Sequence, residues 1–377
     1  MCRAGRYRCK SEPGEHHTDL NMNEEFFRGK TVLIMGLGRF GGGVDVTKFT
    51  AQVGAKVIVT DLLTEQKLSD SISQLDEFPD IEYHLGSHDE TDFLQADIIV
   101  ANPAVPPNNK FLQLARRHKK IVTSQIGIFF ELCPATIIGI TGSNGKSTTA
   151  ALTAHLLRGT IDEGRQTTEN RGQRTEDRSQ IPNDERRATS DENVWLSGNI
   201  GNEPLLTTLN QIKANDLVVL ELSSFQLEQL AEIRKAPKVA LLTNLTPNHL
   251  DRYGTFENYW AAKENIFRFQ KLDENYPAVS IFNAEDKIAT EWFEKYKCDI
   301  GRICIKFSPE DVSQNIRENF ALPGRANLSN LAAAIAIAKY FGVDDDQIKN
   351  SLPTFKALPH RLELIAKIAG VHWYNDS

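Results

Sequence analysis

A glycine-rich stretch that ends in lysine and serine is the part of this 377-residue sequence best suited to chemistry. The segment GITGSNGKSTT begins within the apolar run Ala135–Ile140 and leads into a pattern of helical period. In such a turn the backbone N–H groups point at an anion, and the following helix adds its positive dipole end. Lys146 would supply charge for the β- and γ-phosphates of a nucleotide, and Ser147 a hydroxyl for Mg²⁺. The predicted phosphate loop comprises Gly142, Ser143, Asn144, Gly145, Lys146, Ser147 and Thr148.

The loop departs by one position from the strict pattern G-x-x-x-x-G-K-[ST]. Five residues before Gly145 stands Ile140, and the first glycine is Gly139. The plain alternative is a glycine–asparagine turn followed by an exposed lysine. Because a strand pattern precedes the loop and a helix pattern follows it, we interpret the segment as a variant phosphate loop.

Side chains that could hold a metal come later in the chain. Glu221 ends the apolar run Asp216–Leu220, where its carboxylate would reach the Mg²⁺ of a phosphate-loop site; the plain alternative is a charged residue at a strand end. The segment NLTPNHLDRYGTFENYWAAKENIF contains His249, Asp251 and Lys263. A lone histidine is more often structural than a ligand, and a lone lysine on a helix is usually solvated.

A second glycine motif lies near the amino terminus. In GLGRFGGG, Gly36, Gly38 and Gly41 have the spacing G-x-G-x-x-G, and Asp61 ends the next strand pattern. Taken alone, this combination indicates a dinucleotide site of the NAD type. Asn102 follows another strand pattern of the same region, where it could line the pocket.

Short apolar runs alternate with stretches of helical period along most of the chain. The strand-like runs are residues 31–38, 55–61, 96–105, 119–124, 135–141, 216–224, 238–246 and 278–286. Strand, helix and strand at this spacing predict parallel βαβ units and an α/β fold. The alanine-rich segment 331–343 predicts a helix that packs on a sheet.

Composition limits the classes of function. The net charge is −7 and the pI about 5.8, which argues against a general nucleic-acid binder. Five cysteines show no paired spacing, which is typical of a reducing cytosol. Neither a membrane span nor a signal peptide is recognisable, so we expect a cytoplasmic protein with small-molecule partners.

Two segments are too polar to fold alone. Residues 1–28 predict a disordered tail, with Met22 as an alternative start. From Arg158 to Asn193 the chain carries many charges of both signs and almost no large apolar residue. This composition predicts a disordered surface insertion at 158–193.

Seven strings together resemble the Mur ligases, the ATP-dependent amide ligases of peptidoglycan precursor synthesis. They are GITGSNGKSTT, LSGNIGNEPLL, LELSSFQLE, LTNLTPNHLDRYGTFENYWAAKENIF, IFNAEDK, LPGRANLSNLAAAIAIA and LPHRLE…GVHWYNDS. The resemblance covers roughly residues 29–377 apart from the insertion. Within the family, SSFQLE and GNIG resemble most closely the member that adds D-glutamate.

The resemblance implies a reaction. ATP would phosphorylate the free carboxylate of UDP-N-acetylmuramoyl-L-alanine, and the amine of D-glutamate would then displace phosphate. Such a ligase works in cell wall synthesis, and so in cell shape and division. Two Mg²⁺ ions and Lys146 would neutralise the charge of the two anions brought together. The family also implies a monomer that binds neither nucleic acid nor membrane.

The resemblance also implies roles for single residues. Lys146, Ser147 and Glu221 would hold phosphates and the first Mg²⁺. His249 would ligate the second ion, and Lys263 matches the family lysine that is carbamylated, which turns a cation into a carboxylate-like metal ligand. The positions near the nucleotide sugar are Asn199, Ser223 and Gln226, and the one near the adenine is Asn283.

Three domains are implied. They are a Rossmann-like UDP-binding domain at 29–134, a central P-loop ATP-binding domain with a parallel sheet at 135–321, and an incomplete Rossmann-like carboxyl-terminal domain at 322–377. In the family the first domain holds UDP, with the glycines near the diphosphate and Asp61 near the uridine. The family therefore favours UDP over NAD.

Three features depart from the family pattern. Ala326 stands where the family has histidine, so we expect an ATP contact to be absent. The insertion separates the phosphate-loop helix from GNIG. The last residue, Ser377, falls inside the family's NDSKATN motif, before most of the domain that binds D-glutamate, so we expect impaired ligation. The alternatives are a non-catalytic remnant that binds UDP-sugar and ATP, or a related ligase such as folylpolyglutamate synthase.

Overall fold

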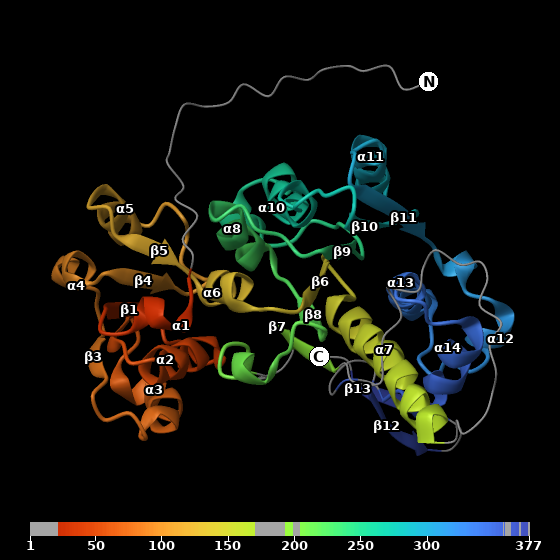
Figure 1. Ribbon diagram of the computed structural model, residues 1–377, viewed down its shortest axis with the longest axis horizontal. Coiled ribbons are helices and arrows are strands. Elements are labelled where there is room, and N and C mark those ends of the chain that lie inside the picture. Colours follow the sequence, from red (N-terminus) through yellow and green to blue (C-terminus); the bar gives the residue numbers. More distant parts are fainter. Residues whose placement is uncertain are drawn as a thin grey trace.

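Two parallel sheets with helices on their faces form the body of the protein (Figure 1). The computed structural model describes residues 22–169, 193–198, 204–356, 358, 363–368 and 371–375. Among these residues, no helix is both long and apolar enough to cross a lipid bilayer. The predicted α/β class is confirmed.

The first sheet lies in the amino-terminal third of the chain. Its strands are β1 (Thr31–Met35), β2 (Lys56–Asp61), β3 (Glu82–Leu85), β4 (Ile98–Ala101) and β5 (Ile121–Thr123). Their order is β3-β2-β1-β4-β5, and all neighbours are parallel. The helices around them are α1 (Glu24–Phe27), α2 (Gly42–Gln52), α3 (Glu65–Ile72), η1 (Ser73–Leu75), α4 (Glu90–Gln95), α5 (Lys110–Arg117) and α6 (Gln125–Leu132).

The second sheet is larger. Its strands are β6 (Thr136–Thr141), β7 (Val194–Gly198), β8 (Leu217–Glu221), β9 (Val239–Leu242), β10 (Ala278–Asn283) and β11 (Arg302–Phe307). They follow the order β11-β10-β9-β6-β8-β7, again all parallel. The helical elements that accompany it are α7 (Lys146–Glu169), η3 (Leu209–Gln211), α8 (Ser224–Glu232), α9 (Leu250–Tyr253), α10 (Phe256–Arg268), α11 (Lys287–Tyr296), η4 (Pro309–Asp311), α12 (Gln314–Arg317), α13 (Arg325–Tyr340), α14 (Asp345–Ser351) and η5 (Leu352–Thr354).

The strands are apolar on both faces because helices cover both sides of each sheet. On β1, Val32 and Ile34 belong to a core that also contains Leu220 and Leu242 of the second sheet. The alternate residue Leu33 faces a separate core with α4 and α5. The first of these cores therefore joins the two sheets.

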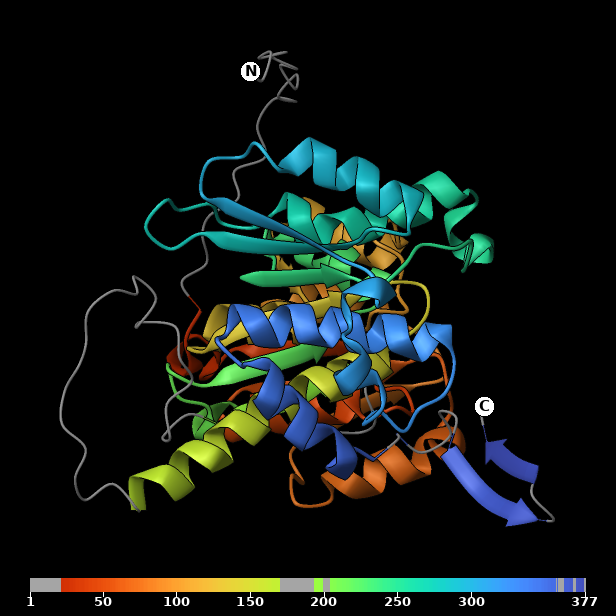
Figure 2. The same cartoon turned by 90° about the vertical axis from the view of Figure 1, so that its right-hand side faces the viewer.

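The carboxyl-terminal elements differ from the expected domain division. Helix α13 packs on α7, β10 and β11, and Ala334 shares a core with Ile138 and Ile140 of β6 (Figure 2). The expected boundary at residue 322 therefore does not separate two packing units, and we place the end of the central unit after η5. An antiparallel hairpin follows, formed by β12 (Glu363–Ile368) and β13 (Val371–Asn375).

Two predictions of disorder are wrong in part. Helix α7 continues to Glu169, so the first part of the segment 158–193 is helical. In the predicted tail 1–28, α1 forms, and Phe27 is fully buried with its ring edge-on to Phe49. The remainder of both segments, up to residue 21 and from 170 to 192, lies outside the described residues.

Candidate active site

The predicted phosphate loop connects β6 to α7 at the carboxyl edge of the second sheet. Gly142 has a φ of 151° and Gly145 a φ of 80°. A Cβ atom on Gly142 would lie 1.9 Å from Thr243 Oγ1, and one on Gly145 would lie 2.1 Å from Asn330 Oδ1. Both positions therefore require glycine for conformation and for space. Thr148 lies in the first turn of α7.

A polar segment after β9 braces this loop. The N–H of Ser143 donates to the Asn244 carbonyl at 2.9 Å, and the Ser143 hydroxyl donates to the Thr246 carbonyl at 2.8 Å. The N–H of Asn144 donates to Asn244 Oδ1 at 3.0 Å. The Thr149 hydroxyl donates to Asn330 Oδ1 on α13 at 3.4 Å. These contacts fix the loop backbone before any anion arrives.

Of the residues predicted to hold phosphates and Mg²⁺, Ser147 and Glu221 are in direct contact, and Lys146 bonds to the loop itself. Glu221 ends β8 opposite Ile140 of β6, so the parallel register brings its carboxylate beside the loop. The Ser147 hydroxyl donates to Glu221 Oε2 at 2.7 Å, and Glu221 is only 2% exposed. Lys146 Nζ donates to the Ser143 carbonyl at 3.1 Å. A carboxylate and a hydroxyl in contact beside a phosphate loop are the donors that Mg²⁺ uses in such sites.

Lys263 points from α10 into the same region. Its side chain is 2% exposed, and Nζ donates to Thr141 Oγ1 at 3.3 Å. Burial and the charge of Lys146 hold the pKa of Lys263 well below its ordinary value of 10.5, and Glu221 opposes the shift. A neutral amine is a nucleophile, and it reacts with carbon dioxide to form a carbamate. The environment thus suits the modification that the family resemblance implies.

His249 precedes α9 in a left-handed conformation with φ of 51°. Its ring lies 5.0 Å from that of Phe225 and 6.1 Å from that of Tyr259. Burial and the charge of Lys263 lower the pKa of His249, while Asp251 opposes the shift. The lowered pKa favours the neutral imidazole, which is the form that ligates metals. In the described part of the chain, no three His, Cys, Asp or Glu residues form a metal cluster of their own.

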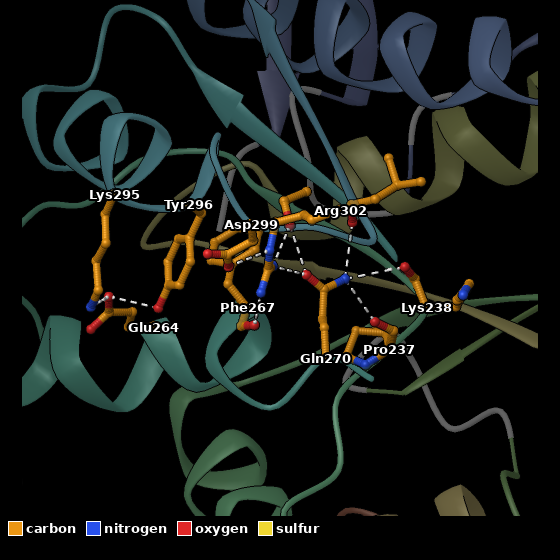
Figure 3. Close-up of polar contacts among 11 residues, drawn as sticks. Pro237, Lys238, Glu264, Phe267, Gln270, Lys295, Tyr296, Asp299 and Arg302 are labelled. Atoms are coloured by element: carbon orange, nitrogen blue, oxygen red, sulfur yellow. Dashed lines mark hydrogen bonds and ion pairs between the residues drawn. The ribbon is translucent and has the colours of Figure 1, made fainter. Parts of the chain in front are cut away.

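A buried polar network holds α10, and with it Lys263, in place (Figure 3). The Gln270 amide donates to the main-chain oxygens of Pro237, Lys238 and Val279. Arg302 on β11 donates to Gln270 Oε1 at 2.5 Å, to Ser280 Oγ at 2.7 Å and to the Phe267 carbonyl at 3.1 Å. Glu264 on α10 accepts hydrogen bonds from two residues of α11, Lys295 and Tyr296. Helix α10 and the residues just after it are thus hydrogen-bonded to both β11 and α11.

The amino-terminal glycines lie where the strand order of the first sheet reverses, between β1 and β4. Crevices at such switch points are where open α/β sheets bind ligands. The N–H of Gly38 donates to Asp61 Oδ2 at 3.0 Å, and Asn102 Nδ2 donates to the Gly36 carbonyl at 3.2 Å. Gly36 has a φ of 91°, and Gly41, with φ of 83°, caps α2. The structure therefore places Gly36 against Asn102 and Gly38 against Asp61, while Gly41 begins the helix that follows the glycine loop.

Three of the remaining predicted residues make hydrogen bonds within the protein. Ser223 and Gln226 form a capping box with each other at the start of α8, just after Glu221. Asn283, at the end of β10, donates from Nδ2 to the Thr243 carbonyl at 2.7 Å. Asn199 lies outside the described residues.

Two family models match the chain. The model of the Mur ligase middle domain matches residues 140–338, and that of the Mur ligase MurD-like N-terminal domain matches residues 30–124. The chain belongs to the Mur ligase family. The first match runs from the phosphate loop through most of α13, and the second spans β1 to β5 with the glycine motif. Both candidate sites thus lie in Mur ligase domains.

Relatives and solved structures agree with this assignment. A UDP-N-acetylmuramoylalanine–D-glutamate ligase of Roseiflexus sp. (strain RS-1) is 36% identical over 370 residues, covering 93% of this chain and 72% of the relative. A ligase of the same name from Clostridioides difficile (strain 630) is 32% identical over 363 residues, with coverage of 93% and 72%. The solved UDP-N-acetylmuramate:L-alanyl-gamma-D-glutamyl-meso-diaminopimelate ligase from Neisseria meningitides matches with a TM-score of 0.55 at 16% identity, covering 88% of this chain and 99% of that one. At that identity the last likeness concerns the Mur ligase fold alone.

Several residues of the site were not predicted. Asn244 and Thr246 brace the phosphate loop, and Asn330 approaches it from α13. Their signal in the sequence is weak: polar residues after a strand, and an asparagine inside an alanine-rich helix. The structure explains the approach: Gly142 and Gly145 have no Cβ, which leaves the space that Asn244 and Asn330 occupy beside the loop.

Proposed function

We propose that this Mur ligase uses ATP to join D-glutamate to UDP-N-acetylmuramoyl-L-alanine. The relatives at 32–36% identity carry that activity in their names, and the chain covers more than two thirds of their length. The observation that carries the proposal is the contact of Ser147 with Glu221 beside the buried amine of Lys263. Nothing in a folate ligase or a plain nucleotide binder accounts for the MurD-like amino-terminal domain.

The first step is phosphoryl transfer. A carboxylate oxygen of the L-alanine attacks the γ-phosphorus of ATP, the bond to the β-phosphate oxygen breaks, and ADP leaves. Lys146 and the loop N–H groups hold the phosphates and offset the charge that develops between two anions. In the second step the D-glutamate amine attacks the acyl carbon, phosphate leaves, and the amine loses a proton.

The residues present fit two magnesium ions. Ser147 and Glu221 would hold the first, and His249 with carbamylated Lys263 the second. Bound Mg²⁺ would polarise the phosphoryl oxygens and neutralise their charge. The low pKa of Lys263 supports its carbamylation, because only the unprotonated amine adds carbon dioxide. A carbamate in place of an ammonium would also remove the repulsion between Lys263 and Lys146.

The nucleotide sugar would bind in the crevice at the switch point of the first sheet. Gly36, Gly38 and Gly41 would approach its diphosphate, and Asp61 its uridine. Asn102, Asn199, Ser223 and Gln226 would lie along the path toward the phosphate loop, and Asn283 near the adenine of ATP. The MurD-like amino-terminal match favours UDP over NAD at these glycines.

The cellular setting follows from the substrates. ATP and nucleotide sugars are cytoplasmic metabolites, and the cysteines Cys133, Cys298 and Cys304 are free thiols, as suits a reducing compartment. We therefore propose a cytoplasmic, monomeric enzyme of peptidoglycan precursor synthesis, and so of cell shape and division.

The test is product formation. The protein is incubated with Mg-ATP, bicarbonate, UDP-N-acetylmuramoyl-L-alanine and labelled D-glutamate, and both ADP and the amide are measured. Lys146→Ala should lose both products, and Lys349→Ala, at a partly exposed lysine of α14, should lose neither. Binding of both nucleotides without ADP or amide would contradict ligation and favour the non-catalytic alternative.

A further inference from the structure

The loop that follows β4 is held by the ATP-binding unit. Gln229 on α8 donates from Nε2 to the Ala101 carbonyl at 3.0 Å. Arg252 on α9 donates from Nη1 to the Pro103 carbonyl at 3.2 Å and to the Ala104 carbonyl at 3.1 Å. Three main-chain oxygens at the end of one strand of the first sheet thus accept from two helices that accompany the second.

On its other side the same loop is bonded to β1. Asn102 lies between Ala101 and Pro103, whose carbonyls accept the bonds just described. It donates from its N–H to the Met35 carbonyl at 2.9 Å and from Nδ2 to the Gly36 carbonyl at 3.2 Å. Its Oδ1 accepts from the N–H of Ala104 at 3.0 Å. Asn102 is therefore fixed between the glycine loop of the nucleotide-sugar crevice and the central unit.

Arg252 is itself firmly placed. Its side chain is 17% exposed, Nη2 donates to Glu228 Oε2 at 3.0 Å, and the guanidinium lies 4.0 Å from the Phe225 ring. Its N–H donates to the His249 carbonyl at 3.1 Å. The planar guanidinium has five N–H donors in a fixed fork, which reach the carboxylate and the two carbonyls from one side chain; a lysine has three donors at a single point. One arginine thus connects the His249 segment with the Asn102 loop.

We propose that Arg252 is a positioning residue that couples the two sites of the enzyme. By its hydrogen bonds to Pro103 and Ala104 it positions Asn102 for contact with the nucleotide sugar. It also fixes the position of the nucleotide-sugar crevice relative to the metal-binding residues of the central unit. This inference rests on the proposed function, because it names the part of the chain that aligns the nucleotide sugar with ATP. Gln229 supports the same loop from α8.

Binding measurements on the full chain test the proposal. The ligands are UDP-N-acetylmuramoyl-L-alanine and, separately, the magnesium complex of a non-hydrolysable ATP analogue, both followed by calorimetry. Arg252→Met keeps the apolar stem over Phe225 and removes the donors. It should raise the Kd of the nucleotide sugar about tenfold, as the loss of charged hydrogen bonds does, and change that of the ATP analogue less than about twofold.

Further variants separate positioning from folding. Arg252→Lys should bind the nucleotide sugar more tightly than Arg252→Met does, but less tightly than the unaltered protein. Gln229→Met should raise the Kd of the nucleotide sugar about threefold, since one neutral hydrogen bond is lost. The matched control is Arg317→Met. Arg317 also donates to two carbonyls, those of Val312 and Pro309, which are far from this loop in sequence. Its substitution should therefore leave the Kd of the nucleotide sugar unchanged.

Three results would overturn the proposal. Equal nucleotide-sugar affinity of Arg252→Met and the unaltered protein would show that the loop needs no such support. If Arg252→Met lost affinity for both ligands equally and also had a lower unfolding midpoint, Arg252 would act on stability alone. Failure of the unaltered protein to bind the nucleotide sugar would contradict the proposed function first, and this inference with it.

Discussion

At the scale of single residues, the chemistry depends on charge states that burial imposes. Lys263 lies beside Lys146 and is shielded from water, so its ammonium form is disfavoured. Burial is the main cause that lowers the pKa of His249. The sequence places both residues in one segment, but only the fold shows that a strand end, a phosphate loop and a helix surround them. Their protonation could not be read from spacing.

Lys263→Arg should lower the rate of ADP formation by at least about a hundredfold, a loss typical of a missing charge-stabilising group. Arginine stays protonated in proteins and cannot be carbamylated. Mass spectrometry under bicarbonate should find one added carbon dioxide on the unaltered protein and none on the variant. Lys295→Arg, at an exposed lysine that pairs with Glu264, is the matched control. Retention of more than about a tenth of the rate would contradict a metal-binding role for Lys263.

A surface histidine should make stability depend on pH. Hydrogen bonding to Asp92 is the main cause that raises the pKa of His84 above 6.5; Glu82 adds to it, and burial opposes it. The stabilisation is fully present below pH 6.5 and is lost as the pH rises through the pKa of the folded state. His84→Gln should therefore cost more stability at pH 5.5 than at pH 8.5, by less than about 1 kcal/mol because the pair is partly exposed. Urea unfolding at both pH values decides this, and equal costs would refute it.

At the scale of elements, polar contacts rather than apolar pattern decide where the helices of the site lie. The apolar runs in the sequence correctly predict the strands β1, β2, β4, β5, β6, β8, β9 and β10. Most of these strands are buried on both faces, which makes their runs apolar. The register of α10 depends on Gln270 and Arg302, whose side chains look like ordinary surface residues in the sequence. The packing of α13 against α7 was expected only as helix on sheet, since alanine spacing does not reveal the partner.

Arg302→Met should destabilise the protein by about 1–3 kcal/mol, because it removes the charged donor that Gln270 Oε1, Ser280 Oγ and the Phe267 carbonyl share. The hydroxyl of Ser280 still donates to Gln270 Oε1 in the variant, which limits the loss. Chemical denaturation measures the loss. Arg268→Met, at an exposed arginine that ends α10, is the control and should change stability by less than about 0.5 kcal/mol. Equal effects of the two substitutions would mean that the network does not hold α10.

At the scale of the whole molecule, a buried carboxylate joins the two sheets. Asp45 on α2 is 6% exposed and accepts from the N–H groups of Leu205, Leu206 and Thr207, and from the Thr207 hydroxyl. Gln125 Nε2 donates to it as well, at 2.6 Å. The sequence could predict the two units but not this contact between them. Asp45 looks like one polar residue on a helix, Gln125 lies 80 positions away, and the three N–H partners lie at least 160 positions away.

Asp45→Asn should cost at least about 2 kcal/mol, because an amide cannot accept on both sides and at least one buried N–H loses its partner. Since the joint connects two units, the slope of the urea transition should also fall if the units come to unfold separately. Asp70→Asn, on the exposed face of α3, should change neither quantity. An unaltered stability of Asp45→Asn would show that the carboxylate does not secure the interface.

The central claim is that Lys146, Ser147 and Glu221 transfer a phosphoryl group to the carboxylate of the nucleotide sugar. The most direct measurement omits D-glutamate and traps the acyl phosphate. With Mg-ATP, bicarbonate, UDP-N-acetylmuramoyl-L-alanine and hydroxylamine, we predict a hydroxamate that forms together with ADP and disappears in Lys146→Ala. ATP consumption without hydroxamate, or hydroxamate that persists in Lys146→Ala, would contradict the account.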